Sequence, residues 1–158
     1  MIKDILIHPD KKLRVKSKSI LVKEIKSKEM SAFLVDMEET MLEKDGIGLA
    51  APQIGVHKRV VVVNTKDGVV ALINPKISKK SWRKESEEEG CLSLPGVFGF
   101  VKRSAKITFN ARGYDGEKIN FEAKGLFARV IQHEVDHLDG ILFIDRAKKT
   151  KKINVSEE

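Results

Sequence analysis

Residues 131–140, IQHEVDHLDG, are the stretch that decides how this chain is interpreted. They place His133 and His137 four residues apart, with Glu134 directly after the first histidine. Residues four apart on a helix lie on the same face, so both imidazoles can reach one metal ion. A glutamate beside the first ligand can contact a water on that ion without binding the ion itself. The pattern H-E-x-x-H therefore predicts a metal site on a helix, and its third ligand has to come from elsewhere.

The helix that carries this pattern is expected over about residues 126–139, with Gly140 closing it. Leu126 and Val130 precede the histidines at helical spacing and share their face. A solvated histidine pair would not continue an apolar stripe. The stripe therefore favours a metal site over two exposed side chains.

In the rest of the chain, the spacing of apolar residues predicts one more helix and two pairs of strands. The helix is expected over residues 27–44, where the apolar spacing is helical and the methionines are interpreted as core side chains. Hairpins plus two helices predict an α+β fold. The expected strands are residues 59–64, 69–74, 105–112 and 117–123.

Length and composition indicate one soluble domain. The chain has 158 residues, of which 41% are hydrophobic and 34% charged. Its single cysteine, Cys91, excludes an intramolecular disulfide. No apolar run has the length of a membrane span, and the N-terminus has no signal-peptide core. We therefore expect no membrane partner and a cytoplasmic location, in a bacterium or a host cell, with an organelle matrix as the alternative.

The net charge of +7 comes from lysines in residues 11–28 and from Lys148, Lys149, Lys151 and Lys152. Attraction to RNA is one interpretation of this charge. No aromatic-rich RNA-binding signature accompanies the lysines in the sequence. Solubility or weak steering is therefore the favoured interpretation, and no specific nucleic acid is expected as a partner.

The third ligand distinguishes between classes of metal site. One protease pattern continues as H-E-x-x-H-x-x-G-x-x-H, but its last position here is Phe143, which cannot bind a metal. The ligand is therefore expected upstream, from His8, His57 or Cys91. Both of these histidines lie in polar, lysine-flanked surroundings. Cys91 lies between a glycine and a short apolar run, and a thiolate suits a transition metal.

The chain contains GIGLAAPQIG at 46–55, EGCLSLP at 89–95 and QHEVDHLDG at 132–140, in that order. Together these three stretches resemble the motifs of the peptide deformylase family. The resemblance covers residues 1–146, which are expected to form the catalytic domain, and leaves residues 147–158 as a polar, lysine-rich tail that we expect to be mobile. It implies antiparallel strands packed around the central helix that carries HEVDH. HPDKKLR at 8–14 and LFIDR at 142–146 resemble the flanking signatures of the family.

The resemblance also implies a cofactor and a substrate. The family's metal ligands correspond to Cys91, His133 and His137, with water in the fourth position. The implied ion is Fe²⁺ in cells, and Zn²⁺, Ni²⁺ or Co²⁺ can occupy such a site. The implied substrate is the N-formylmethionyl end of a nascent peptide, which loses formate.

The reaction implied by the resemblance is a hydrolysis by metal-bound water. Glu134 takes a proton from that water and later gives it to the departing amine. The oxyanion formed on the way needs hydrogen-bond donors. By resemblance these are the side-chain amide of Gln53 and the backbone N–H of Leu92.

The substrate contacts are expected from three places. Gly46 and Gly48 let the backbone approach the peptide, and Leu126 and Val130 are candidate walls for the methionine side chain. Residues 96–101 are expected to offer a strand edge to the extended peptide. One turn before His133, Arg129 is expected to pack its stem while its guanidinium reaches water.

The sequence leaves two other functions open. A zinc endopeptidase would cleave unformylated internal peptide bonds. A basic RNA- or ribosome-binding module would hold a structural metal, which needs a fourth protein ligand. The sequence ends twelve residues after Arg146, so a ribosome contact through a long C-terminal helix is not expected, although the tail lysines remain candidates for touching RNA.

Overall fold

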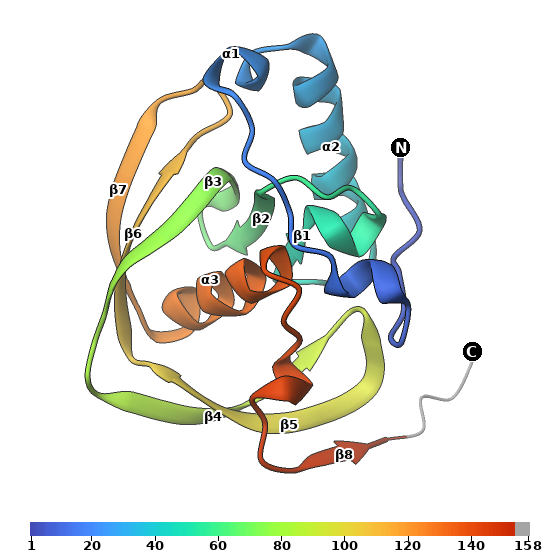
Figure 1. Cartoon of the computed structure of the whole chain (residues 1–158), viewed down its shortest axis with the longest axis vertical. Helices are drawn as coiled ribbons and strands as arrows, with labels where there is room; N and C mark the ends of the chain where they lie inside the picture. Colours follow the sequence, from blue (N-terminus) through green and yellow to red (C-terminus); the bar gives the residue numbers. More distant parts are fainter. Residues whose placement is uncertain (154–158) are drawn as a thin grey trace.

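The computed structural model describes residues 1–153 and places one helix between two antiparallel sheets. This helix, α3 (Gly125–Leu138), lies at the centre of the molecule, and the second sheet curves beneath it in Figure 1. The five-stranded sheet has the order β1 (Gly48–Ala50), β2 (Val60–Thr65), β3 (Gly68–Lys80), β6 (Lys106–Arg112) and β7 (Lys118–Lys124). The three-stranded sheet has the order β4 (Lys84–Cys91), β5 (Leu94–Ser104) and β8 (Thr150–Lys152).

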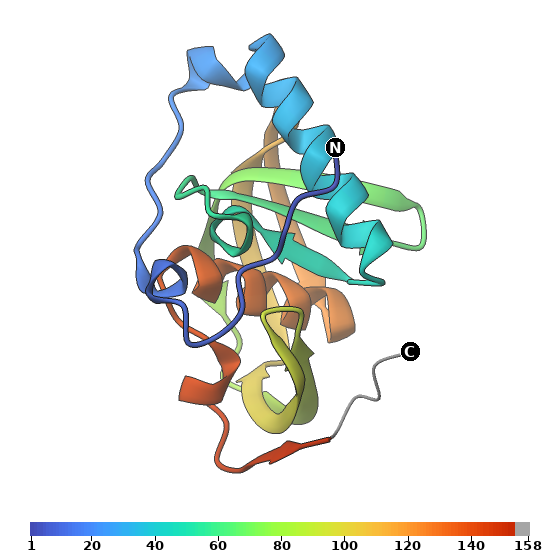
Figure 2. The ribbon, with the colours of Figure 1, turned by 90° about the vertical axis from the view of Figure 1, so that its right-hand side faces the viewer.

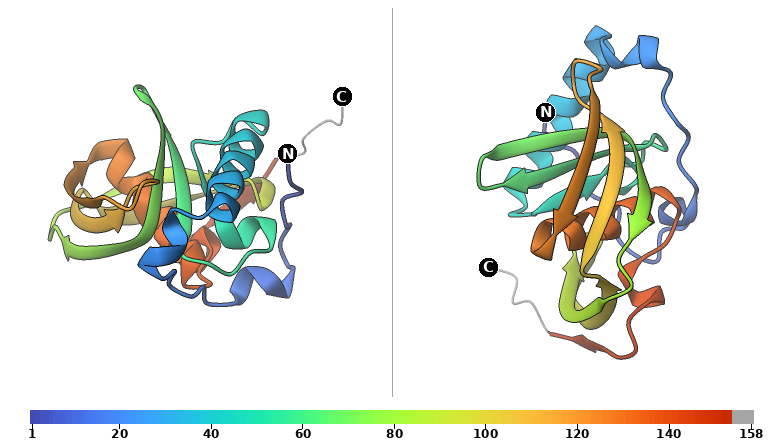
Figure 3. Two further views of the ribbon diagram at one scale, coloured as in Figure 1. Left: turned by 90° about the horizontal axis from the view of Figure 1, so that it is seen from above. Right: turned by 90° about the vertical axis from the view of Figure 1, so that its left-hand side faces the viewer.

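Strand β2 is buried on both faces because helices cover both sides of the five-stranded sheet. Val61 and Val63 pack in the cluster that contains the α3 side chains. Val60 and Val62 point the other way, into the cluster built by α2 (Lys28–Glu43). Successive strand residues alternate between faces, so a run of four valines suits a strand between two helices. The left view of Figure 3 shows this sheet between α2 and α3.

Helix α2 is the amphipathic helix expected over residues 27–44. Ser27 caps its first turn, because its hydroxyl accepts a hydrogen bond from the backbone N–H of Met30 at 3.1 Å. The methionines Met30, Met37 and Met41 are buried, as expected for core side chains. Figure 2 shows α2 running across the sheet. The short helices are α1 (Val22–Ile25) and the 3-10 turns η1 (Lys11–Arg14), η2 (Ala51–Ile54) and η3 (Phe143–Asp145).

The α+β class and the central HEVDH helix are confirmed. The expected strands are confirmed to within about a residue at most ends, except that β3 continues to Lys80 instead of ending near residue 74. The long hairpin of β4 and β5 was not predicted as a unit. Within residues 1–153 there is no helix with both the length and the apolar character needed to cross a membrane.

Two expectations about the second sheet are wrong. Residues Thr150–Lys152 of the expected mobile tail form β8, which pairs with Val97, Phe98 and Gly99 of β5. Strand pairing uses backbone groups, so polar side chains do not prevent it. Because β8 pairs with these three residues, this part of the peptide-binding edge expected at residues 96–101 is already occupied. The part of the tail after residue 153 lies outside the described residues.

Candidate metal centre and active site

Three side chains from two distant parts of the chain converge beside α3. The candidate ligand atoms of Cys91, His133 and His137 all lie within 4.8 Å of one another. The Cys91 Sγ is 3.3 Å from Nε2 of His137. Cys91 ends β4, and α3 presents both histidines on one face, as their spacing requires. This is the one group of three or more candidate ligands among residues 1–153, and neither His8 nor His57 belongs to it.

The donor set and its surroundings fit a catalytic transition-metal ion. One sulfur and two imidazole nitrogens suit iron, cobalt, nickel or zinc, and three protein ligands leave a position open for a reacting molecule. Nδ1 of His133 lies 2.8 Å from Oε1 of Glu89, which leaves Nε2 of His133 to face the ion. Nδ1 of His137 is buried, and no residue of the described chain satisfies it.

The two histidines differ in how readily they hold a proton. Burial lowers the pKa of His137 well below its ordinary value, which favours the neutral imidazole that binds metals. Burial also lowers the pKa of His133, but hydrogen bonds to Cys91 and Glu89 outweigh burial and raise the pKa to about 10. An ion that enters must therefore displace a proton from His133, so metal binding should release protons.

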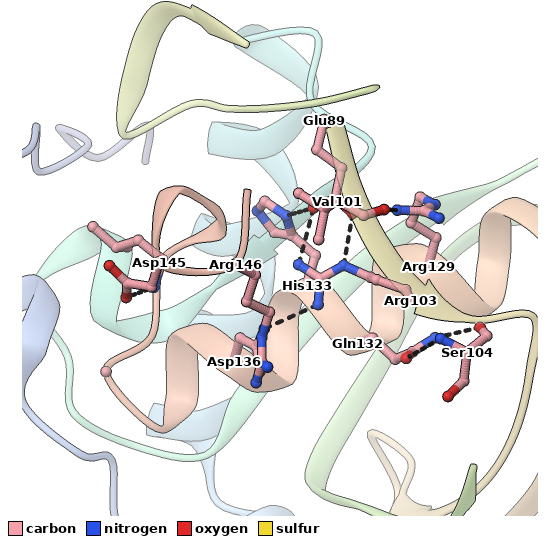
Figure 4. Close-up of polar contacts among 12 residues, drawn as sticks. Glu89, Val101, Arg103, Ser104, Arg129, Gln132, His133, Asp136, Asp145 and Arg146 are labelled. Carbon is pink, nitrogen blue, oxygen red and sulfur yellow. Dashed lines mark hydrogen bonds and ion pairs between the residues drawn. The ribbon is translucent and has the colours of Figure 1, made fainter. Parts of the chain in front are cut away.

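Glu89 is the hub of a buried charge network behind His133, shown in Figure 4. It accepts hydrogen bonds from Nε and Nη2 of Arg103, at 2.6 and 2.9 Å, and from Nη1 of Arg129 at 2.6 Å. Burial raises the pKa of Glu89, but hydrogen bonds from His133 and Arg103 outweigh it and hold the pKa at about 2. A carboxylate that stays ionised fixes the orientation and the tautomer of His133.

The guanidinium of Arg129 does not reach water, contrary to expectation. Its side chain is only 11% exposed. Besides the contact with Glu89, it donates to the backbone carbonyls of Val101 and Glu85, at 2.9 and 2.8 Å. The acceptors lie on β4 and β5, far from Arg129 in sequence, so helical spacing alone could not reveal them.

Glu134 is buried next to the ligand group. Its Oε2 has no hydrogen-bond partner among the described residues. Burial raises the pKa of this carboxyl to about 7, so it can both hold and release a proton near neutral pH. A Cβ on Gly48 would lie 2.8 Å from Oε1 of Glu134 and 2.9 Å from a methyl group of Val130. A glycine at position 48 thus makes room for Glu134 itself, where the sequence suggested room for a peptide.

Gln53 has a fixed orientation at the same site. The backbone N–H of Ala50 donates to its Oε1 at 2.9 Å, so the amide nitrogen must face the other way. That nitrogen donates to Oγ of Ser93 at 3.1 Å and lies 3.6 Å from Sγ of Cys91. The turn η2 supplies Gln53, and the amide N–H group is therefore aimed at the ligand group.

A pocket of about 870 Å³ opens in front of these groups. Its rim includes residues of β1 and β4, each of which is the outer strand of its sheet. His137 is the one sequence-predicted site residue that does not line it, because it is buried behind Cys91. The others line it, namely Gly46, Gly48, Gln53, Cys91, Leu92, Leu126, Val130, His133 and Glu134. Below, this is called the active-site pocket.

Sequence reasoning missed the residues that support the site. Glu89 stands inside the EGCLSLP stretch, but the run of acids before it looks like a solvated strand face. Arg103 has no sequence signal of its own, yet it bonds both Glu89 and Asp136, the latter at 2.9 Å. Ser93 holds the amide of Gln53. Only the rule that a metal-bound histidine has a second hydrogen-bond partner could have suggested searching for Glu89.

Comparisons with known proteins agree with this geometry. The family model for polypeptide deformylase matches residues 2–153. Peptide deformylase of Dictyoglomus thermophilum is 48% identical over 147 residues, covering 93% of this chain and 94% of the relative. The crystal structure of peptide deformylase from Thermotoga maritima has a TM-score of 0.90 and 38% identity, covering 94% of this chain and 99% of that one.

A second solved structure is similar along nearly the whole chain. It is the Met-Ala-Ser-bound class I type b peptide deformylase of Acinetobacter baumannii, with a TM-score of 0.89 and 33% identity. The aligned region covers 92% of this chain and 98% of the Acinetobacter baumannii chain. The match of the family model to nearly all described residues, together with these relatives, shows that the chain belongs to the polypeptide deformylase family of enzymes.

Proposed function

We propose that this enzyme hydrolyses the formamide bond of N-formylmethionine at the start of a nascent polypeptide and releases formate. One observation carries the proposal: Cys91, His133 and His137 converge within 4.8 Å of one another beside the buried Glu134, whose Oε2 has no hydrogen-bond partner within residues 1–153. When bound by these three residues, a divalent ion supplies a Lewis acid and lowers the pKa of a coordinated water. Groups of the protein itself then transfer the proton and stabilise the oxyanion.

Glu134 is the proton carrier in this proposal. Its Oε2, to which no described residue donates a hydrogen bond, takes a proton from the attacking water and then gives it to the amine that leaves with the peptide. Nearly complete burial keeps bulk water from competing for that oxygen. Glu134 can hold its carboxylate in this position because Gly48 has no Cβ that would overlap with it.

The amide of Gln53 and the backbone N–H of Leu92 are the donors for the oxyanion. The amide is already oriented by Ala50 and Ser93, so no reorganisation is needed when charge develops on the formyl oxygen. One such donor typically lowers the barrier by about 3 kcal/mol. Leu92 follows Cys91 in the turn between β4 and β5 and lines the active-site pocket.

The peptide binds as an extended strand between the free edges of β1 and β4. Both edges line the active-site pocket, whereas the edge of β5 expected from the sequence is occupied by β8. The methionine side chain packs against Val130, with Leu126 at the exposed rim. The Met-Ala-Ser peptide on the Acinetobacter baumannii relative supports a substrate that begins with methionine.

Fe²⁺ is the ion proposed for the enzyme in cells, with Zn²⁺, Ni²⁺ and Co²⁺ as substitutes that suit the same donors. The place of action is where nascent chains are made, in a cytoplasm or an organelle matrix.

Formate release from a formyl-Met-Ala-Ser peptide tests the proposal. Protein prepared without oxygen and loaded with Fe²⁺ is assayed beside the Cys91→Ala variant, with metal content measured in both. Release by the parent and loss in the variant, together with weaker metal binding, would support the proposal. Cleavage of an unformylated peptide without formate would instead support an endopeptidase. Metal-loaded parent protein that releases no formate would overturn the proposal.

A further inference from the structure

A second hollow, of about 960 Å³, lies on the side of α3 that faces away from the active-site pocket. Helix α3 contributes Gln132, Val135 and Asp136 to it, on a different face from the one that carries Glu134, and Asp139 follows directly after the helix. The opposite wall consists of residues from β3, from β4 and from the end of β5. Five lysines line it, and this hollow is called the basic groove below: Lys16, Lys76, Lys80, Lys84 and Lys102.

The charge of the basic groove is largely unbalanced. All five lysines are exposed, and none of them forms a salt bridge with a described residue. The two acids of the groove already have partners: Asp136 bonds Arg103 and Arg146, and Asp139 bonds Arg59. The arginines therefore neutralise the acids that line the groove in the described part of the chain, and the five lysines present a positive field.

Trp82 stands on the rim of this groove with 98% of its surface exposed. It belongs to the turn between β3 and β4, whose backbone is held on both sides. The N–H of Ser81 donates to the carbonyl of Lys106 at 2.8 Å, and the N–H of Ala105 donates to the carbonyl of Arg83 at 3.0 Å. The indole is thus displayed from an anchored turn, and it buries almost no surface within the fold.

We propose that the basic groove binds RNA, with phosphates against its lysines and one unpaired base stacked on Trp82. Single-stranded nucleic acids combine these two needs, a positive groove that follows the backbone and an aromatic face for a base. An anionic membrane is less suited, because the lysines line a hollow and not a protruding face, and Trp82 is the one exposed large apolar side chain among the described residues that line it. This inference does not depend on the proposed function.

Trp82 makes the inference directly measurable, because it is the only tryptophan in the chain. The metal-loaded protein is titrated with an unstructured 12-nucleotide RNA at several salt concentrations, and indole fluorescence is recorded. We expect saturable quenching, because stacking brings the base onto the indole, and an affinity that falls as salt rises. An unchanged emission spectrum at saturating RNA would overturn the proposal.

Matched lysine variants separate the groove from net charge. In the first variant, Lys80, Lys84 and Lys102 become glutamine. In the control variant, the exposed Lys23, Lys26 and Lys28 become glutamine, which removes the same charge outside the groove. We expect the groove variant to lose at least tenfold in affinity and to lower the salt slope by about 2, with little change in the control. Equal losses in both variants would overturn the proposal.

A second pair of variants isolates the stacking contact, with binding followed by anisotropy of end-labelled RNA. We expect Trp82→Ala to lose about tenfold in affinity and Trp82→Phe to retain most of it, because phenylalanine keeps an aromatic face. Equal affinities of Trp82→Ala and the parent would refute the stacking. Phosphatidylglycerol vesicles serve as the alternative partner, and tighter binding to vesicles than to RNA would also refute the proposal.

Discussion

Two hollows of similar size flank helix α3, and their chemistry differs. The active-site pocket, of about 870 Å³, has buried ionisable groups at its base, and one of them, Oε2 of Glu134, has no partner among the described residues. The basic groove, of about 960 Å³, has exposed lysines and acids that are already paired. Judged by volume alone, the basic groove would be the stronger candidate for an active site. Unpartnered, buried groups with shifted pKa values are the better indicator of catalysis.

The two hollows share a wall. The guanidinium of Arg103 bonds Glu89 on the side of the active-site pocket and Asp136 on the side of the groove, and its side chain is only 4% exposed. Figure 4 shows both contacts. A change on one side of Arg103 can therefore affect the hollow on its other side.

Glu134→Gln should have the largest effect. An amide cannot carry the proton, so the rate of formate release should fall by about a thousandfold, within the range for loss of a general base. Metal content should stay the same, because Glu134 does not belong to the ligand group. Rate and metal analysis on the same sample check this, and a variant with near-parental activity would exclude Glu134 as the proton carrier.

Gly48→Ala should cost about a hundredfold in activity, since an added Cβ would meet Glu134 and Val130 and displace the carboxylate. Gly46→Ala is the matched control. A Cβ there would lie 2.8 Å from Cδ1 of Leu92, the end of a flexible side chain that can move aside, and 3.3 Å from Cγ of Met41. Steady-state rates of the two variants are compared, and a larger loss in Gly46→Ala would contradict the packing argument.

Glu89→Gln should weaken metal binding by about 10- to 100-fold, because His133 loses its carboxylate partner. Glu87→Gln is the control, since Glu87 lies on the same strand but does not line the active-site pocket. Competition with a coloured chelator measures the affinities. Equal metal affinities for Glu89→Gln and the parent would show that His133 is held by other contacts.

The same variant should change how stability depends on pH. The pKa of Glu89 is about 2 in the folded chain, below its ordinary value of 4.5. Its contribution to the free energy of unfolding is therefore complete above pH 4.5 and is lost as the pH falls towards 2. In metal-free protein, the stability difference between parent and Glu89→Gln should narrow over this interval. Denaturant unfolding at pH 7, 4 and 3 measures it, and a constant difference would be inconsistent with the prediction.

Substitution of Lys80, Lys84 and Lys102 by glutamine should have the smallest effect on catalysis. These residues lie outside the active-site pocket, so kcat/KM for a formyl-Met tripeptide should stay within about twofold of the parent. The same variant is expected to lose RNA affinity. A parallel loss of activity would mean that the two hollows are coupled through their shared wall.

Most of the sequence predictions that the structure confirms depended on patterns within a single segment of the chain. The helix with His133 and His137, the amphipathic helix α2 and the hairpin of β6 and β7 follow periodic patterns that each segment carries within itself. Cys91 as a third ligand came from elimination and from family resemblance, and the structure brings it to both histidines. The wrong predictions concerned β8 and Arg129, whose partners lie on strands that their own sequence neighbourhood does not reveal.

The sequence by itself determined the α+β class and the helix that places His133 and His137 on one face, because spacing on a helix fixes which side chains share a face. Only the tertiary structure decided what surrounds them. Glu89 reaches His133 across 44 residues, and the basic groove gathers Lys16, Lys84 and Lys102 from three separate segments. Such neighbours are set by how sheets and helices pack, and packing joins segments whose local patterns contain no record of each other.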